Sequence, residues 1–178
     1  SVRIVTDHLR SMTFMIADGI LPSNEGRGYI LKRIIRRAAR HCKLLGIEKD
    51  NPLSELAESV IKTSGGAYPE LVEKHDYIIK MITIEENNFA KTLDNGMDIL
   101  DSYIEDLKSK GETELSGELT FKLYDTYGFP LEVTQEILEE KGKTVDVEGF
   151  TEKMNAQKEL ARANQRDTEG DAWRDRKS

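Results

Sequence analysis

Cysteine, tryptophan and histidine are scarce in this sequence, with one, one and three among 178 residues. A lone cysteine cannot form an intramolecular disulfide or complete a cysteine-rich zinc site. No apolar run approaches the roughly 18 residues of a membrane-spanning helix, so we expect no contact with a membrane. The sequence also lacks an Asn-x-Ser/Thr glycosylation site. Together these absences favour a reducing compartment, and we expect the protein in the cytoplasm.

The N-terminal residues, Ser-Val-Arg-Ile-Val, match neither a secretory signal nor a transit peptide, and they lack an initiator methionine. We therefore expect this chain to be a piece of a longer protein. Its 178 residues are enough for one domain, or two small ones, with a hydrophobic core. Apolar residues make up 38% of the chain and charged residues 33%, which is common in helical proteins with wide solvated faces.

Charge is distributed unevenly along the chain. The net charge is -7, yet residues 1–46 contain nine Lys and Arg against three Asp and Glu, a net of +6. The remainder holds 17 basic and 30 acidic residues, a net of -13. This asymmetry indicates that the electrostatic field of the protein is directional, and it argues against a general affinity for polyanions. A basic segment on an acidic body therefore points to one localised cationic surface.

Hydrophobic residues recur at helical spacing along nearly the whole chain. The expected helices cover residues 2–17, 29–45, 52–63, 69–108, 116–124 and about 130–141, followed by a last helix that Asp146 caps. No alternating strand pattern and no internal repeat is present. We therefore predict an all-α, multi-helix fold with one long central helical stretch, residues 69–108.

Two glycine positions and the C-terminal tail complete this outline. Gly96 lies inside the central stretch, where it costs about 1 kcal/mol relative to alanine, and this predicts a close contact or a bend. In "YDTYGFP", Gly128 and Pro130 end one helix and start the next. We assign residues 1–165 to one helical domain. Residues 166–178 have mixed charge and no periodicity, which indicates a disordered tail or the start of a missing continuation.

The residue inventory argues against catalytic and metal-binding patterns. His8, His41 and His75 lie in different segments, and none has a partner at a metal-ligand spacing. Cys42 follows His41 directly, but neighbours on a helix point about 100° apart, and Cys42 falls on the apolar face, which favours a core role. The "GKT" at 142–144 lacks the first glycine and the preceding strand of a phosphate-binding loop. We predict no catalytic or metal-binding residue in this chain.

Six cations share one face of the helix expected at residues 29–45, and no acidic residue accompanies them. On a wheel of 100° per residue they span about 200–340°, opposite an apolar face of Ile, Leu, Ala and Cys. The six are Lys32, Arg33, Arg36, Arg37, Arg40 and Lys43. Ion pairs within this helix do not account for them. They indicate a surface for nucleic-acid phosphates; the alternatives are a solvated face, or pairing with the acidic body through another helix.

Two segments offer side chains suited to contact a base. In "PSNEGRG", residues 22–28, Pro22 and two glycines shape a turn, and Asn24 offers both a donor and an acceptor. On residue type alone, Ser23 or Asn24 as a helix cap is the favoured interpretation. In "LYDTYGFP", Asp125 lies at a helix end, where a carboxylate amid basic residues would have to face a base amino group. The neighbouring tyrosines are interpreted as packing residues, with stacking on a terminal base as the alternative.

These segments resemble the family of alanyl-tRNA synthetases. "ADGILPSNEGRGYILKRIIRRAARH" looks like the segment that follows the aminoacylation core in that family, and "LTFKLYDTYGFPLEVTQEILEEKG" looks like a second motif of the family. "EENNFAKTLDNGMDIL" fits the helix between them. With "VDVEGFTEKMNAQKELARAN", the similarity covers roughly residues 1–165. Several long motifs in the family's order make the resemblance specific.

The resemblance implies an α-helical domain that binds the tRNA acceptor stem, with a G·U wobble pair as the identity signal. The Asn and Asp that are associated with this pair in the family correspond to Asn24 and Asp125. Arg27 and the cationic face would hold the stem by its phosphates. In a G·U pair the guanine 2-amino group is unpaired in the minor groove, the accessible groove of A-form RNA. A carboxylate can accept a hydrogen bond from that group.

The resemblance also implies partners and absences. The partners would be the acceptor stem of tRNA(Ala) and the aminoacylation and editing domains of the same parent chain. The family's ATP and zinc sites would lie in those domains, so we expect no cofactor and no catalysis in this chain alone. The alternative is a helical scaffold that joins the catalytic and editing domains without contacting RNA bases.

Overall fold

Eight helices and one two-stranded sheet make up the described residues, 1–175, of the computed structural model, in which side chains are described as far as residue 167. The helices are α1 (Val2–Ala17), α2 (Gly26–Leu44), α3 (Pro52–Ser64), α4 (Pro69–Glu73), α5 (His75–Lys110), α6 (Gly117–Tyr127), α7 (Leu131–Glu140) and α8 (Val147–Asp175). The predicted all-α, multi-helix fold is confirmed, and its central stretch is α4 followed by the 36-residue α5. No helix in this part of the chain is long and apolar enough to cross a membrane.

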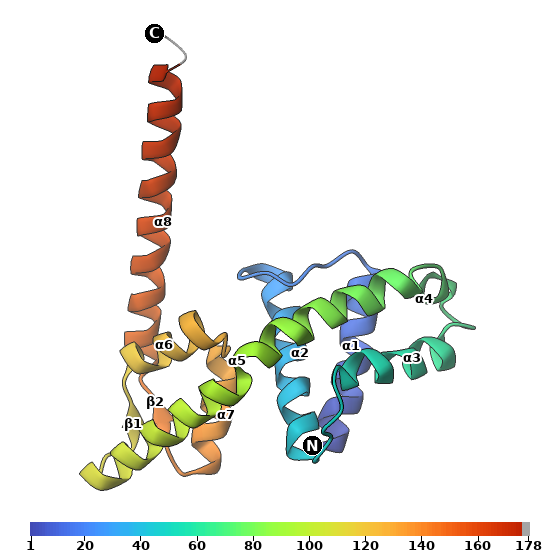
Figure 1. The fold of residues 1–178 in the computed structure, drawn as a ribbon, viewed down its shortest axis with the longest axis horizontal. Helices are drawn as coiled ribbons and strands as arrows, with labels where there is room; N and C mark the ends of the chain where they lie inside the picture. The colour runs from blue at the N-terminus through green and yellow to red at the C-terminus, as the bar shows by residue number, and fades with distance from the viewer. Residues whose placement is uncertain (176–178) are drawn as a thin grey trace.

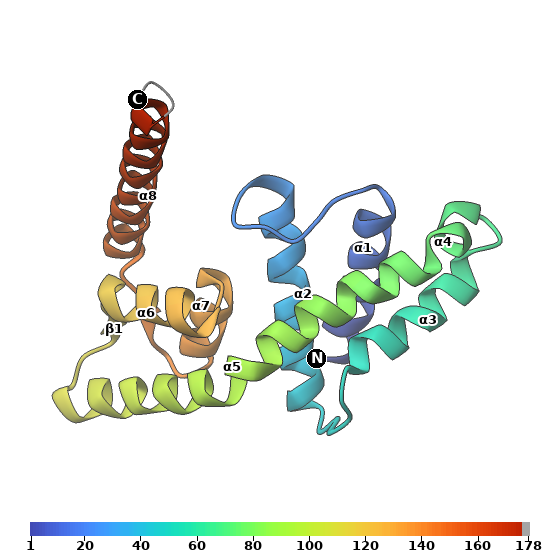
Figure 2. The ribbon, with the colours of Figure 1, turned by 45° about the horizontal axis from the view of Figure 1, so that its top comes forward.

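Two hydrophobic cores lie along α5 (Figure 1). The first packs α1–α4 against the N-terminal half of α5, and its fully buried members include Met12, Leu31 and Ile78. The second packs α6, α7 and the two strands against the rest of α5, around Phe89 and Phe129. Figure 2 shows the same arrangement from a second angle. Because α5 belongs to both cores, it fixes the position of α2 relative to α6.

The sequence pattern does not predict the two short strands, β1 (Glu114–Leu115) and β2 (Thr144–Val145). They pair in parallel and join the segment before α6 to the segment before α8. Leu115 and Val145 are buried in the second core. Strands of two residues are too short to produce an alternating pattern, and only the tertiary fold brings them together.

Gly96 lies where α5 passes the segment between α6 and α7. A Cβ atom at this position would collide with the ring of Phe129 and lie within 3.1 Å of Cβ of Tyr127. The close contact predicted from a costly glycine inside a helix is therefore confirmed. The missing side chain lets the fully buried Phe129 ring approach the α5 backbone.

We expect Gly96→Ala to lower the free energy of unfolding by about 1 kcal/mol. Inserting atoms into a packed core costs about 1–3 kcal/mol, and the better helix propensity of alanine offsets about 1 kcal/mol of this. Urea denaturation followed by circular dichroism measures the change. Gly66→Ala is the matched control, because no atom lies within 4 Å of a Cβ placed there. A Gly96→Ala protein at least as stable as wild type would contradict the packing explanation.

The start of α8 is held against α6. Asp146 Oδ1 accepts a hydrogen bond from the backbone N–H of Gly149 at 3.0 Å, which confirms the predicted cap. A Cβ atom at Gly117 would collide with the backbone of Gly149 and Phe150, so α6 and α8 cross in close contact. The first turns of α8 therefore have a fixed direction relative to α6.

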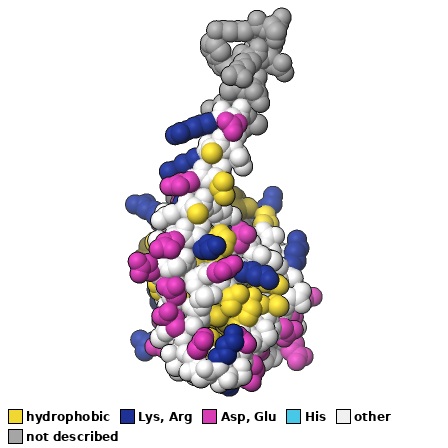
Figure 3. Space-filling model, turned by 90° about the vertical axis from the view of Figure 1, so that its left-hand side faces the viewer, with side chains coloured by type: hydrophobic (Ala, Val, Ile, Leu, Met, Phe, Trp, Pro, Cys, Tyr) yellow, Lys and Arg dark blue, Asp and Glu magenta, His cyan; other side chains and the backbone are white. Residues whose placement is uncertain are grey.

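Beyond this crossing, α8 extends away from the rest of the molecule (Figures 1 and 2). Residues 166–175, expected to be a disordered tail or the start of a continuation, are helical, and residues 176–178 lie outside the described residues. In Figure 3, basic and acidic side chains and a few hydrophobic ones line the projecting stretch. The helix thus exposes a long polar surface next to α6.

Candidate nucleic-acid interface

A cavity of about 290 Å³ lies between the loop before α2, the middle of α5 and the α6–α7 turn. Its lining residues are Asn24, Tyr29, Lys32, Arg36, Asn88, Thr92, Tyr124, Asp125, Thr126, Tyr127, Gly128 and Pro130. The structure therefore brings together Asn24 and Asp125, which are far apart in the sequence. We refer to this space as the Asn24–Asp125 cavity.

The loop that carries Asn24 folds back on the first turn of α2. The N–H of Ser23 donates to the carbonyl of Gly28 at 3.1 Å, and Ser23 Oγ donates to the carbonyl of Glu25 at 2.9 Å. Gly26 has a φ of +60°, in the left-handed region that favours glycine. A Cβ atom at Gly28 would collide with the side chain of Ser23. Both glycines are thus required by the shape of the loop.

Asn24 is exposed and does not cap α2. The residue at the N-cap is Glu25, and it makes no side-chain capping bond, so the cap interpretation of Ser23 or Asn24 is wrong. Lys32 Nζ donates instead to Asn24 Oδ1 at 2.9 Å. Because an ammonium group can only donate, this contact uses one acceptor site of the amide oxygen. The NH₂ group of Asn24 is left as a donor for a ligand.

Asp125 lies exposed in the last turn of α6, as expected from its position before the helix break. Its Oδ1 atom accepts a hydrogen bond from Nε2 of Gln157 on α8 at 3.0 Å. The neighbouring Tyr124 packs its ring edge against Phe150, with centroids 5.7 Å apart. Burial, followed by the charge of Asp125, raises the pKa of Tyr124. Tyr124 therefore serves packing, while Asp125 presents an acceptor at the surface.

Arg36 joins three elements around the cavity and is only 7% exposed. Its Nε donates to Glu85 Oε1 on α5 at 2.8 Å, and Nη1 donates to the carbonyl of Gly128 at 2.5 Å. The guanidinium carbon also lies 5.1 Å from the ring centroid of Phe89, a cation–π distance. Arg36 therefore holds the turn after Asp125 against α2 and α5. The sequence predicted Arg36 on a surface that faces phosphates, but its side chain is buried.

Three acidic residues of α7, spaced one turn apart, pair with arginines of α2. The N···O distances are 3.3 Å for Arg33–Glu132, 2.7 Å for Arg37–Glu136, 3.3 Å for Arg40–Glu136 and 3.1 Å for Arg40–Glu140. Arg40 is buried, whereas the side chains of Arg33 and Arg37 are about one third exposed. For Arg33, Arg37 and Arg40, the structure thus agrees with the alternative in which another helix pairs with the cationic face.

Accessible cations remain near the start of α2. Arg27 is exposed, and Lys32 is half-buried beside the Asn24–Asp125 cavity. Burial, followed by the charge of Arg36, lowers the pKa of Lys32. Lys43, at the opposite end of α2, is exposed and pairs with Asp94 of α5. The exposed cationic surface is therefore smaller than the sequence predicts, and it is centred on the first turns of α2.

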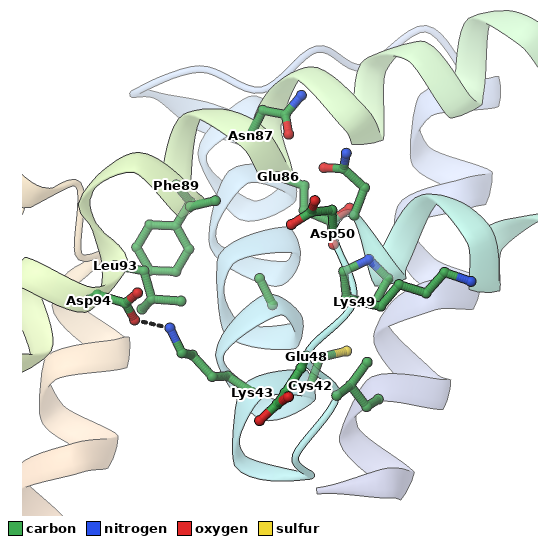
Figure 4. A pocket seen from close by; sticks show the side chains of 15 residues that line it. Cys42, Lys43, Glu48, Lys49, Asp50, Glu86, Asn87, Phe89, Leu93 and Asp94 are labelled. Atoms are coloured by element: carbon green, nitrogen blue, oxygen red, sulfur yellow. Dashed lines mark ion pairs between the residues drawn. The ribbon is translucent and has the colours of Figure 1, made fainter.

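A larger cavity of about 670 Å³ lies between the end of α2, the α2–α3 loop and α5 (Figure 4). On its wall, Glu86 accepts hydrogen bonds from the N–H of Leu53 at 2.9 Å and from Ser54 Oγ at 3.3 Å. Burial raises the pKa of the Cys42 thiol to about 11, and the side chain is 1% exposed, in agreement with the predicted core role. Among the predicted site residues, Lys43 alone lines this cavity.

Asn88 and Thr92 line the Asn24–Asp125 cavity, although the sequence patterns gave them no role. They lie four residues apart on α5, and Thr92 Oγ1 donates to the carbonyl of Tyr127 at 2.7 Å. The four-residue spacing of Asn88 and Thr92, next to the buried Phe89, was the sequence signal that could have identified them. Within the described part of the chain, no group of three or more His, Cys, Asp or Glu side chains is placed to hold a metal ion.

The described residues thus form a helical domain with a polar cavity beside exposed cations. The profile of the family "tRNA synthetases class II (A)" matches residues 1–177. The chain belongs to this family.

Curated relatives narrow the comparison within the family. The chain is 55% identical to an alanine–tRNA ligase of Clostridioides difficile over 175 residues, which cover 98% of this chain and 20% of the relative. It is 54% identical to an alanine–tRNA ligase of Acetivibrio thermocellus, with the same two coverages. It is 58% identical to alanine–tRNA ligase 1 of Lachnoclostridium phytofermentans over 163 residues, 92% of this chain and 18% of that protein. The chain thus spans about one fifth of the length of these relatives.

Proposed function

We propose that this chain is the part of an alanine–tRNA ligase that binds the acceptor stem of tRNA(Ala) and contacts its G·U wobble pair. The observation that carries the proposal is that Asn24 and Asp125 line one cavity. The identity to alanine–tRNA ligases over nearly the whole chain supports the choice of substrate. The volume of the cavity, about 290 Å³, lies just below the usual range for small-molecule sites, about 300–1,000 Å³.

The two side chains have opposite hydrogen-bonding character. The Asp125 carboxylate can only accept, and it would accept from the guanine 2-amino group that a G·U pair leaves free in the minor groove. Lys32 donates to the Asn24 oxygen, and the NH₂ group of Asn24 would donate to an oxygen of the same base pair or of the adjoining ribose. A G·C pair engages the guanine amino group in base pairing and offers Asp125 a weaker partner.

Phosphate contacts would come from the cations around the start of α2. Arg27 and Lys32 flank the loop of Asn24, and the partly exposed Arg33 and Arg37 follow along the helix. Such contacts position an RNA without distinguishing its sequence. Lys43 lies further along α2 and would contact the stem only beyond this region. Arg36 and Arg40 would support the site through their carboxylate partners.

The proposal places the chain in a cytoplasmic parent enzyme that attaches alanine to tRNA(Ala) using ATP. ATP binding, alanine binding and zinc-dependent editing would belong to other domains of that parent. Those domains would be the chain's protein partners, and the RNA would lie against α2, α5 and α6. The similarity to proteins about five times as long supports this assignment of functions to other domains.

A binding titration with two acceptor-stem minihelices, identical except for a G·U or a G·C pair, tests the proposal. We expect wild type to prefer the G·U minihelix, and Asn24→Ala or Asp125→Ala to reduce that preference about tenfold, within the range for a specific base contact. Fluorescence anisotropy at low and at physiological salt measures both affinities. The overall affinity is expected to fall with salt as phosphate contacts are screened.

Two exposed residues provide matched controls for this titration. Asn87→Ala removes an amide from α5, and Glu118→Ala removes a carboxylate from the first turn of α6. Neither side chain lines the Asn24–Asp125 cavity, so both variants should keep the wild-type preference. Equal affinity of wild type for both minihelices at low salt would overturn the proposal.

A second candidate is a scaffold that joins catalytic and editing domains without contacting bases. The observation in its favour is the pairing of Arg33, Arg37 and Arg40 with carboxylates of α7. Under this alternative, substitution of Arg33, Arg37 or Arg40 changes the stability of the domain and leaves RNA binding unchanged. The minihelix titration separates the two candidates directly.

A further inference from the structure

Two consecutive residues of α8 contact the two segments that carry Asn24 and Asp125. Gln157 Nε2 donates to Asp125 Oδ1 at 3.0 Å, and Lys158 Nζ lies 3.5 Å from Oε1 of Glu25, the neighbour of Asn24. Neither residue lines the cavity itself. The helix α8 therefore reaches both segments that carry the proposed base contacts.

The position of Gln157 is set by the packing of α8 on α6, the helix that also carries Asp125. The close crossing at Gly117 and Gly149 and the cap at Asp146 fix the first turn of α8. Phe150 of α8 packs against Tyr124, the residue before Asp125. Gln157 follows Phe150 by two helical turns, so its reach to Asp125 depends on rigid elements rather than on a loop.

An exposed carboxylate at a helix end rotates freely about its last side-chain bond unless one oxygen is held. The Gln157 amide holds Oδ1 of Asp125, which restricts the rotation and leaves Oδ2 for a second donor. A neutral amide does this without placing a cation beside Asp125 that would compete with the base for the carboxylate. The contact therefore orders the acceptor and keeps it available.

We propose that Gln157 is a positioning residue for base discrimination, which orients the Asp125 carboxylate toward a guanine amino group. This inference rests on the proposed function, because it acts through Asp125. Gln157 need not touch the RNA. Lys158 has a different effect: by pairing with Glu25 it reduces the negative charge next to the loop of Asn24.

A double-mutant cycle on the full chain tests this role, with the G·U and G·C minihelices as probes. We expect Gln157→Ala to reduce the G·U preference about threefold to tenfold, as expected for one lost hydrogen bond. In an Asp125→Ala background, the same substitution should cause no further change. Lys158→Ala should weaken binding of both minihelices to the same extent. Circular dichroism of each variant checks that the fold is retained.

Asn155→Ala is the matched control, because it also removes a neutral, exposed amide from α8. Two residues along a helix lie about 160° apart around the axis, so Asn155 faces away from Asp125. It should keep the wild-type preference. If Asp125→Ala abolishes the preference while Gln157→Ala retains it, the positioning role is overturned and the proposed function stands. An effect of Gln157→Ala that persists in the Asp125→Ala background would equally overturn it.

Discussion

Arg36→Met is expected to lower the free energy of unfolding by about 3–5 kcal/mol, the usual cost of removing one partner of a buried ion pair. The substitution leaves Glu85 buried at 7% exposure without its 2.8 Å ion pair. It also removes the donor to the carbonyl of Gly128 and the cation over Phe89. The turn that follows Asp125 would then lose its attachment to α2 and α5.

Chemical denaturation of the variant measures this effect. Arg27→Met is the matched control, since Arg27 is exposed on the same helix and its replacement should change stability by no more than about 0.5 kcal/mol. Adding Glu85→Leu to Arg36→Met should restore part of the loss, because the unpaired charge is then removed. Unchanged stability combined with weaker RNA binding would instead identify Arg36 as a phosphate contact.

Glu136→Ala is expected to lower the free energy of unfolding by about 2–4 kcal/mol at neutral pH, somewhat below the cost at a fully buried pair. Glu136 accepts hydrogen bonds from Arg37 at 2.7 Å, from Arg40 at 3.3 Å and from His41 at 3.1 Å. Its removal leaves the buried Arg40 with one carboxylate partner, the half-exposed Glu140. The α2–α7 contact would be weakened at its centre.

The same contact predicts loss of stability in acid. Burial would raise the pKa of Glu136, but the hydrogen bonds and charges of Arg37 and His41 outweigh it and lower the pKa. Its contribution is therefore complete above the carboxyl pKa of the unfolded chain and is lost as pH falls through the folded value. Burial and the Arg37 charge also lower the pKa of His8, which adds a loss as pH falls below about 6.5.

Denaturation over a pH series checks the contribution of Glu136. Glu136→Ala should be less stable than wild type at pH 7, and the difference should shrink in acid as the wild-type carboxylate is protonated. Glu140→Ala is the control, because a pair with a half-exposed carboxylate contributes only about 0–1 kcal/mol. A difference between Glu136→Ala and wild type that stays constant with pH would contradict the ionic explanation.

Local features of the fold were predictable because their physics is local. Helical periodicity located the helices, and the capping oxygen of Asp146 accepts the expected backbone hydrogen bond at 3.0 Å. The αL conformation of Gly128, with a φ of +68°, ends α6 where "YDTYGFP" indicates a break. These features depend on residues within one or two helical turns of each other.

The cationic face shows the limit of such prediction. A helical wheel places the six cations on one arc of α2, but it carries no information about which helices pack against them. The carboxylates that pair with Arg33, Arg37 and Arg40 lie about a hundred residues later, on α7. A signal did exist, because Glu132, Glu136 and Glu140 repeat every four residues. Only the tertiary fold brings the two charged faces together.

The candidate site was predicted in part. The resemblance to a family supplied Asn24 and Asp125, and residue type alone had favoured a cap for the first of them. Asn88 and Thr92 complete the cavity from α5, and Gln157 reaches Asp125 from α8. No pattern within a single segment links these residues, because their proximity arises from the packing of separate helices.

The continuity of α5 through both cores has a consequence for how the length of this chain can vary in evolution. One residue inserted into α5 between the cores would turn the second core by about 100° and shift it by about 1.5 Å. Asn24 and Asp125 would then no longer line one cavity, and the packing of Ala39 of α2 against both cores would be disrupted. The middle of α5 therefore has to keep its length for the two halves of the site to stay in register.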